Sequence, residues 1–354
     1  MKKILFTGGG SGGHVTLNLG LIPLFLQNGW QVIYIGSKTG IEKELITKIS
    51  GVKYYAIETG KLRRYISMEN IKDMFKVPVG ILQATKIIFK EKPDVIFSKG
   101  GFVSLPVVIG GFLNRRKIFM HESDVTPGLA NKLSLPFVHK FFTTFVETKN
   151  YVKDKSKIAY VGPVLSDRLY NGDKERALDM LNFGTEKPII MFVGGSLGAK
   201  SINRAVEKNI EQLLEKYQII HICGKGQRCN IMAQGYKQYE FVDAELKDFM
   251  AASDVVISRS GSNAIFELWS LRKPMLLIPL PSSSSRGEQS LNARSFERQG
   301  FAEVIKDEDL EKSGLLLRAI DRVYEERNTL AKNMEESELK YTNLNELYEA
   351  IING

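Results

Sequence analysis

The sequence predicts an α/β protein with two Rossmann-like, doubly wound parallel-sheet domains. Three observations carry this prediction. Strand-like apolar runs alternate with helix-like stretches along most of the chain, which is typical of a parallel sheet covered by helices. The chain also has two halves that each begin with a strand, a glycine-rich loop and a helix. Its length of 354 residues suits two domains better than one.

The first half opens with a strand at Lys3–Thr7, the glycine-rich loop Gly8–His14 and a helix that reaches about Asn28. Pro23 lies inside this helix and is expected to kink it. Further strands are predicted at Gln31–Ile35, Val52–Ile57, Val95–Ser98, Ile118–Met120, Phe141–Thr144 and Ile158–Val161, and helices at Met68–Lys76 and Val79–Lys90. The first domain is therefore expected to span residues 1–162, up to Gly162-Pro163.

The second half repeats the opening, with a strand at Ile189–Val193, the loop Gly194–Gly198 and a helix from Ala199 to about Lys216. Strands at Ile219–Cys223 and Glu240–Val242, a unit at Asp254–Gly300, a charged helix at about Asp321–Glu338 and a last helix at about Asn343–Ile352 follow. The second domain is expected to span residues 163–339, and residues 340–354 are expected to pack back onto the first domain.

The segment Asp254–Gly300 predicts a strand, a tight turn, a helix and a second strand. Ser262 is a candidate N-cap, and Gly261 lets the backbone approach a ligand. A helix N-terminus attracts anions, phosphate above all. Glu267 follows about one turn later as an acceptor suited to the paired hydroxyls of a sugar, although an ordinary acid near a helix start has the same appearance. The polar segment 282–289 follows the second strand, where ligands bind in α/β sheets.

The first glycine loop also fits the dinucleotide pattern G-x-G-x-x-G through Gly8, Gly10 and Gly13. A nicotinamide cofactor would need an acid for its ribose near the end of the next strand, and Gly36-Ser37-Lys38 offers none. Ser37 and Lys38 could instead hold a 2′-phosphate. An NADP site is therefore kept as a minor alternative.

The distribution of charge is more informative than the net charge of +9. Residues 1–162 hold 24 Lys and Arg against 11 Asp and Glu, whereas residues 163–354 hold 25 against 29. The first half is thus expected to face an acidic partner. Nucleic acid is disfavoured because the sequence has no aromatic stacking platform or recognition helix. Basic residues surround apolar ones at Lys61–Arg64, Lys72, Lys76, Lys86, Lys90 and Arg115–Lys117, which would suit an anionic lipid surface.

The chain start has too short an apolar run for a signal peptide, and the stretch Phe102–Leu113 is too short to span a bilayer. Cys223 and Cys229 do not form a disulfide framework. With nearby His221 they raise the question of zinc, but the absence of a second cluster in the sequence favours bystanders. We expect no metal. Asp307-Glu308-Asp309, the one Asp-x-Asp, is interpreted as acids at a helix start.

Several motifs together closely resemble the MurG family, the bacterial UDP-N-acetylglucosamine transferases that convert lipid I to lipid II in peptidoglycan synthesis. They run in the family's order from residue 3 to about residue 300. The motifs are Thr7–His14, Ser98–Phe102, His121-Glu122, Pro127–Lys132, Gly194–Ser196 with Gly198-Ala199, and Ser258–Gly261 with Glu267.

The resemblance implies two Rossmann-like domains facing a cleft, the GT-B arrangement, with UDP-GlcNAc as donor, lipid I as acceptor and no cofactor. It implies a peripheral position on the cytoplasmic face of the membrane, with other cell-wall synthesis or division proteins as further partners. The implied donor contacts are Ser11, Gly12, Gly13, Ser196, Val242, Gly261, Glu267, Gln289, Asp124 and either Ser166 or Arg168. The implied acceptor side holds Gly100, Gly101, His121 and Asn131, and both His121 and Glu122 are either on that side or structural.

His14 would lie at the reacting centre. Its intrinsic pKa suits a general base, and its alternative role is to hydrogen-bond substrate or backbone. Three positions depart from the family pattern: Ser166 stands where many relatives have Arg, Asp124 where others have Asn, and Asn18 where others have Pro. The alternatives are another GT-B-like UDP-sugar enzyme, either an epimerase or a transferase with a different lipid acceptor, and a non-catalytic nucleotide-sugar-binding membrane protein.

Overall fold

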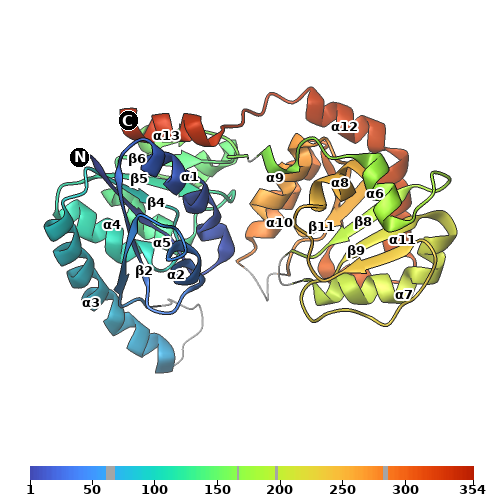
Figure 1. The fold of residues 1–354 in the computed structure, drawn as a ribbon, viewed down its shortest axis with the longest axis horizontal. Helices are drawn as coiled ribbons and strands as arrows, with labels where there is room; N and C mark the ends of the chain where they lie inside the picture. The colour runs from blue at the N-terminus through green and yellow to red at the C-terminus, as the bar shows by residue number, and fades with distance from the viewer. Residues whose placement is uncertain (61–67, 166, 196–197, 282–285) are drawn as a thin grey trace. The chain divides into compact units, whose positions relative to one another are not determined.

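The computed structural model describes residues 1–60, 68–165, 167–195, 198–281 and 286–354. The chain forms two compact units (Figure 1). Unit 1 comprises Met1–Leu165 and Lys340–Gly354, and unit 2 comprises Ser166–Leu339. Among the described residues, no helix has the length and apolar character needed to cross a membrane.

Unit 1 holds a parallel sheet with the strand order β3-β2-β1-β4-β5-β6-β7. The order reverses between β1 and β4, which is the doubly wound pattern that places ligand sites at the carboxyl ends of those strands. The strands are β1 Lys3–Thr7, β2 Gln31–Ser37, β3 Val52–Ile57, β4 Val95–Ser98, β5 Lys117–Glu122, β6 Lys140–Thr143 and β7 Ile158–Tyr160. The helices are α1 Thr16–Gln27, α2 Ile41–Ile46, α3 Met68–Glu91, α4 Ser104–Leu113, α5 Leu129–Ser134 and α13 Leu344–Asn353, with short 3-10 turns η1 Gly12–His14, η2 Leu135–Phe137, η3 Val146–Tyr151 and η4 Lys155–Lys157.

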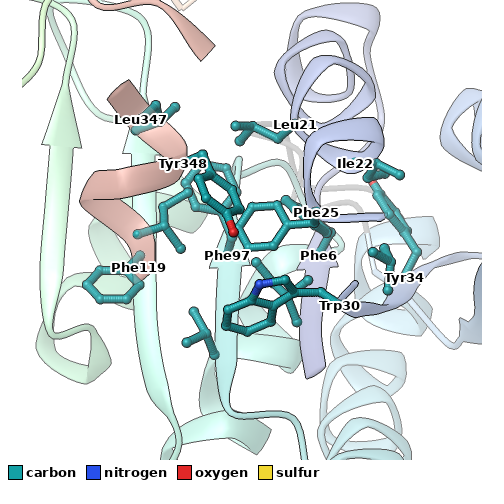
Figure 2. Close-up of a cluster of buried hydrophobic side chains, with 14 of the residues drawn as sticks. Phe6, Leu21, Ile22, Phe25, Trp30, Tyr34, Phe97, Phe119, Leu347 and Tyr348 are labelled. Carbon is teal, nitrogen blue, oxygen red and sulfur yellow. The ribbon is translucent and has the colours of Figure 1, made fainter. Parts of the chain in front are cut away.

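Alternating side chains of β1 face two different cores. Ile4 and Phe6 join the core beneath α1 and α13, and Leu5 joins the core that contains Ala84 and Ile88 of α3. This follows from the two-residue period of a strand with helices on both faces. Leu347 and Tyr348 of α13 lie in the same cluster as aromatic side chains of α1 and the sheet (Figure 2). The ring of Tyr348 lies 4.6 Å from that of Phe25, centroid to centroid.

Unit 2 holds a parallel sheet with the order β10-β9-β8-β11-β12-β13, which reverses between β8 and β11. The strands are β8 Ile189–Val193, β9 Gln218–Ile222, β10 Tyr236–Tyr239, β11 Val255–Ser258, β12 Met275–Leu277 and β13 Ala302–Val304. The helices are α6 Lys174–Leu181, α7 Lys200–Lys216, α8 Leu246–Ala252, α9 Ser262–Ser270, α10 Glu288–Arg298, α11 Leu315–Glu325 and α12 Arg327–Glu335, with 3-10 turns η5 Asp167–Leu169 and η6 Asp307–Glu311.

Four predictions about the secondary structure differ from the structure. The helices expected before and after Pro78 are one helix, α3, whose Ala84 and Ile88 pack on the sheet. A strand is expected at Glu240–Val242, but the strand in this region is β10, Tyr236–Tyr239, which ends just before those residues. It forms there because Tyr236 is buried and pairs with Ile219 of β9.

The charged helix expected at 321–338 is two helices, α11 and α12, separated at Glu326, whose ψ of 1° leaves the helical region. The N-cap of α9 is Gly261 rather than Ser262, which is already helical and buried. The first N–H groups of α9 therefore lack a capping side chain from the N-cap residue.

Candidate active site

The candidate site in unit 1 lies where the strand order reverses, and two glycine loops meet there. The loop after β1 donates from Gly9 N–H to Gly100 O, in the loop after β4, over 3.3 Å. A Cβ atom on Gly101 would lie 2.0 Å from Gly9 O, so only glycine allows this approach. The predicted residues Gly100 and Gly101 are thus brought against the predicted loop Gly8–His14.

His14 closes the 3-10 turn η1 at the outer end of this loop. Its Nδ1 lies 3.0 Å from Ser11 Oγ, so the two predicted residues Ser11 and His14 are neighbours. A Cβ atom on Gly12 or Gly13 would meet no described atom within 4 Å. Packing inside unit 1 therefore leaves space beside these two glycines, on the segment that carries His14.

His121, at the end of β5, is buried next to Lys99. Lys99 Nζ lies 2.9 Å from His121 Nδ1 and also donates to Ser123 Oγ. Burial lowers the pKa of Lys99 to about 8 against the opposing charges of Glu122 and Asp124. Burial, with the Lys99 charge beside it, also lowers the pKa of His121 well below its usual value, so His121 is neutral at pH 7. The side chain of His121 is 2% exposed.

Glu122 organises the turn that follows β5. Its Oε1 accepts from the backbone N–H groups of Ser123 and Asp124 at 2.9 and 3.1 Å. Its Oε2 accepts from Gly128 N and Asn131 Nδ2, both at 2.9 Å. Of the two readings left open for Glu122, these four contacts favour the structural one. Asn131 and Asp124 are held at the same sheet edge through it.

Unit 2 repeats the arrangement of two loops at the strand-order reversal. One loop follows β8 and leads into α7, and the other follows β11 and leads into α9. Ala199 and Gly261 are the N-caps of these helices, and neither has a side chain that can cap. Such helix N-termini attract phosphate through their main-chain N–H groups. The predicted contacts Ser196 and Ser166 lie outside the described residues.

Two predicted donor contacts, Arg168 and Glu267, are paired in the structure. Arg168 Nη2 donates to Glu267 Oε1 over 2.9 Å. Burial raises the pKa of Glu267, and the Arg168 guanidinium partly offsets this. A carboxylate has two oxygens with about four acceptor sites, so the bond from Arg168 to Oε1 leaves Glu267 able to accept from sugar hydroxyls as well.

The remaining donor candidates of unit 2, Gln289 and Val242, follow the carboxyl ends of β12 and β10. Gln289, in α10, accepts from Leu280 N through Oε1 at 3.1 Å and from Ser260 Oγ through its backbone oxygen at 2.9 Å. It thereby ties the start of α10 to the segments that follow β11 and β12. Val242 follows β10 and is buried, and Phe241 beside it is exposed.

The residues raised for an NADP or a metal site have protein partners in the structure. Ser37 is buried and its hydroxyl donates to the Glu42 carboxylate, which would repel a 2′-phosphate. The His221 ring nitrogens lie 2.9 Å from Tyr236 Oη and 3.0 Å from Asn203 Oδ1. The described residues contain no cluster of three potential metal ligands. Asp307, the first acid of the Asp-x-Asp motif, forms an ion pair with Arg259.

Sequence reasoning missed two buried charged residues at the site, Glu42 and Lys99. Glu42 accepts from Gly10 N–H over 3.2 Å, inside the glycine loop. The one signal that could have pointed to Glu42 is its position five residues after Ser37, behind the second strand. Lys99 lies within a motif that the sequence did single out, but nothing in the sequence indicates that its side chain turns inward.

Two parallel α/β units, each with a glycine loop at its strand-order reversal, form the architecture of a two-domain nucleotide-sugar enzyme. Family models show that the class is a glycosyltransferase: the Glycosyltransferase family 28 N-terminal domain matches residues 4–143 and the C-terminal domain matches residues 189–351.

Similar curated proteins narrow the class. The chain is 53% identical over 338 residues to the UDP-N-acetylglucosamine–N-acetylmuramyl-(pentapeptide) pyrophosphoryl-undecaprenol N-acetylglucosamine transferase of Geobacillus kaustophilus, covering 95% of this chain and 94% of that protein. It is 50% identical to a Bacillus thuringiensis transferase of the same name, numbered 3, over 99% of this chain and 100% of that protein. The crystal structure of Acinetobacter baumannii MurG has the same fold, with a TM-score of 0.80, 20% identity and full coverage of both chains. The chain belongs to the MurG family.

Proposed function

We propose that this protein is an inverting glycosyltransferase that moves GlcNAc from UDP-GlcNAc to the MurNAc C4 hydroxyl of lipid I, giving lipid II for peptidoglycan synthesis. The observation that carries this proposal is 50–54% identity to the transferases of that name over most of the chain. An epimerase is not favoured, because the similar structure titled a putative UDP-N-acetylglucosamine 2-epimerase, from Listeria monocytogenes, shares only the fold with this chain, at 14% identity.

In the proposed reaction, the acceptor hydroxyl oxygen forms a bond to the anomeric carbon of GlcNAc while the bond from that carbon to UDP breaks. The hydroxyl proton passes to the His14 imidazole. If Nδ1 donates to Ser11 Oγ, 3.0 Å away, the basic lone pair lies on Nε2. Gly12 and Gly13, beside which there is open space, would lie along the donor sugar, and Gly100 and Gly101 would lie on the acceptor side.

The departing diphosphate gains negative charge, and main-chain amides of unit 2 would meet it. The N-termini of α7 and α9 support this proposal because both lack a capping side chain at the N-cap. Glu267 would accept from the ribose hydroxyls, and Arg168, next to it, would move to the diphosphate. Gln289 would contact the sugar and the backbone at Val242 the uracil. No metal or other cofactor enters this mechanism.

The acceptor's lipid requires a membrane surface, and a face of unit 1 supports that partner. Leu82 and Phe89 of α3 are 64% and 69% exposed, and exposed Lys86 lies between them on the same helical face. Phe112 and Leu113 at the end of α4 are also exposed, next to Arg115. Exposed apolar side chains ringed by basic ones suit an anionic bilayer. The protein would act peripherally at the cytoplasmic face. The predicted basic group Lys61–Arg64 lies outside the described residues.

The decisive experiment is a transfer assay with UDP-GlcNAc and a short-chain lipid I analogue. We expect UDP release only when the analogue is present, with a disaccharide product. UDP-GlcNAc converted to another UDP-sugar without acceptor would indicate an epimerase. Binding of UDP-GlcNAc with no turnover on any lipid acceptor would indicate a nucleotide-sugar-binding protein instead.

A further inference from the structure

Glu42 is a fully buried carboxylate beneath the first glycine loop. It lies in α2, just after β2, and is 0% exposed. Its Oε1 accepts from Ser37 N over 3.0 Å and from the Ser37 hydroxyl, and its Oε2 accepts from Gly10 N over 3.2 Å. These partners are uncharged. A buried carboxylate whose partners among the described residues are neutral donors is costly, so its presence calls for a reason beyond packing.

Two backbone segments approach this carboxylate so closely that a side chain could not intervene. A Cβ atom on Gly9 would lie 2.5 Å from Glu42 Cδ, and one on Gly40 would lie 2.2 Å from Glu42 Oε2. The loop after β1 and the turn after β2 are therefore both shaped around one carboxylate. Gly10 N–H is the point at which it holds the loop that continues to His14.

The outer part of the same loop is held differently. A Cβ atom on Gly12 or Gly13 would meet no described atom within 4 Å, whereas one on Gly101 would lie 3.1 Å from His14 Nδ1. A displacement at Gly10 would thus carry His14 along the face of Gly101. Misplacement of a reacting group by about 1 Å costs roughly 100-fold in rate.

We propose that Glu42 is a positioning residue for glycosyl transfer: its Oε2 fixes Gly10 and thereby the loop that carries His14. This inference rests on the proposed function, because the loop's part in transfer belongs to that function. Glu42 touches neither substrate, and it acts through the backbone of the loop.

Glu42→Gln distinguishes the contact with Ser37 from the contact with Gly10. An amide has one acceptor oxygen, and two donors on Ser37 compete for it against one on Gly10. The amide NH2 then faces Gly10 N–H, and the loop loses its anchor. Ser37→Ala is the matched control, because it removes a hydrogen bond to the same carboxylate and leaves the Gly10 contact in place.

The test compares wild type, Glu42→Gln and Ser37→Ala by steady-state kinetics and by amide hydrogen exchange of residues 8–14. We expect Glu42→Gln to lower kcat by about 10- to 100-fold with donor KM within about threefold, and to speed exchange in that segment. Ser37→Ala keeps kcat and exchange near wild type. Equal kcat in wild type and Glu42→Gln, or equal losses in both variants, overturns the inference.

If Glu42→Gln fails to fold, Glu42→Asp takes its place, because it keeps the charge and the Ser37 side but reaches less far toward Gly10. The same two readouts apply. A wild-type protein without acceptor-dependent UDP release would overturn the proposed function, and the exchange comparison would then decide whether Glu42 holds the loop.

Discussion

Arg168 and Glu267 are linked by a contact that neither residue's sequence context predicts. The 2.9 Å bond between them places an arginine beside the carboxylate proposed for the ribose hydroxyls. Arg168 is proposed to contact the diphosphate, where its guanidinium would make charge-assisted hydrogen bonds. In the structure it pairs with Glu267, so the proposed move of Arg168 to the diphosphate would break this ion pair.

Glu267→Ala is expected to raise the KM for UDP-GlcNAc by about 10-fold or more, with kcat changed by less than about threefold. The reason is that a contact made equally in the bound substrate and in the transition state contributes to binding alone. Steady-state kinetics with varied donor measures this. Glu267→Gln keeps the shape of the side chain and one acceptor oxygen, so its KM for UDP-GlcNAc should lie between those of wild type and Glu267→Ala. A fall in kcat at unchanged KM would contradict a ribose-binding role.

His14→Ala is expected to lower kcat by about 100- to 10,000-fold, the range for loss of a general base. Donor affinity measured by calorimetry should stay near that of wild type, because the imidazole is proposed to take a proton from the acceptor. Near-normal kcat in this variant would mean that the ring only hydrogen-bonds substrate or backbone.

At the scale of elements, α3 divides its surface between the core and solvent. Ala84 and Ile88 face the sheet, and Leu82, Lys86 and Phe89 are exposed. The double variant Leu82→Ser/Phe89→Ser is expected to reduce sedimentation with anionic vesicles by about 10-fold or more, since each large apolar side chain contributes on the order of 1.5–3 kcal/mol on burial.

Met232→Ser in unit 2 is the matched control, because Met232 is 96% exposed and outside this face. It should sediment like wild type. Binding that depends on neither anionic lipid nor salt would remove the membrane partner from the proposal.

The alternation of strands and helices and the two glycine-loop openings could be predicted from sequence because apolar periodicity and glycine spacing are local signals. The continuation of α3 through Pro78 could not be predicted from the sequence, since packing of the helix on the sheet compensates for the one backbone hydrogen bond that a proline removes. The position of β10 in the sequence could not be predicted either, because it is set by pairing with β9. At the site, the neighbours of His14 could be named in advance, whereas buried Glu42 and Lys99 could not, because their burial results from long-range contacts.

At the scale of the whole molecule, each unit buries a neutral histidine, His121 in unit 1 and His221 in unit 2. Burial lowers the pKa of His221 to about 4. An unfolded histidine has a pKa near 6.5, so the unfolded chain binds more protons between these values. The stability contributed by neutral His221 is therefore complete above about pH 6.5 and is lost as pH falls toward 4.

Urea unfolding between pH 7 and 5 checks this. The free energy of unfolding should fall with pH by up to about 1.4 kcal/mol per unit for each buried histidine. His221→Gln should reduce the pH dependence of the free energy of unfolding by the contribution of one histidine, independently of its effect on stability at pH 7. An unchanged slope in the variant would contradict the assignment of His221 as a buried neutral ring.

The core beneath α1 is completed by residues from the far end of the sequence, Leu347, Tyr348 and Ile351. During synthesis on the ribosome, the whole of unit 2 emerges before these side chains do. In the nascent chain, Phe25 and its aromatic neighbours therefore stay uncovered by α13 while some 170 further residues are translated. A stop codon shortly before α13 would leave that face open, and chaperone capture or aggregation of the shortened chain is the expected fate.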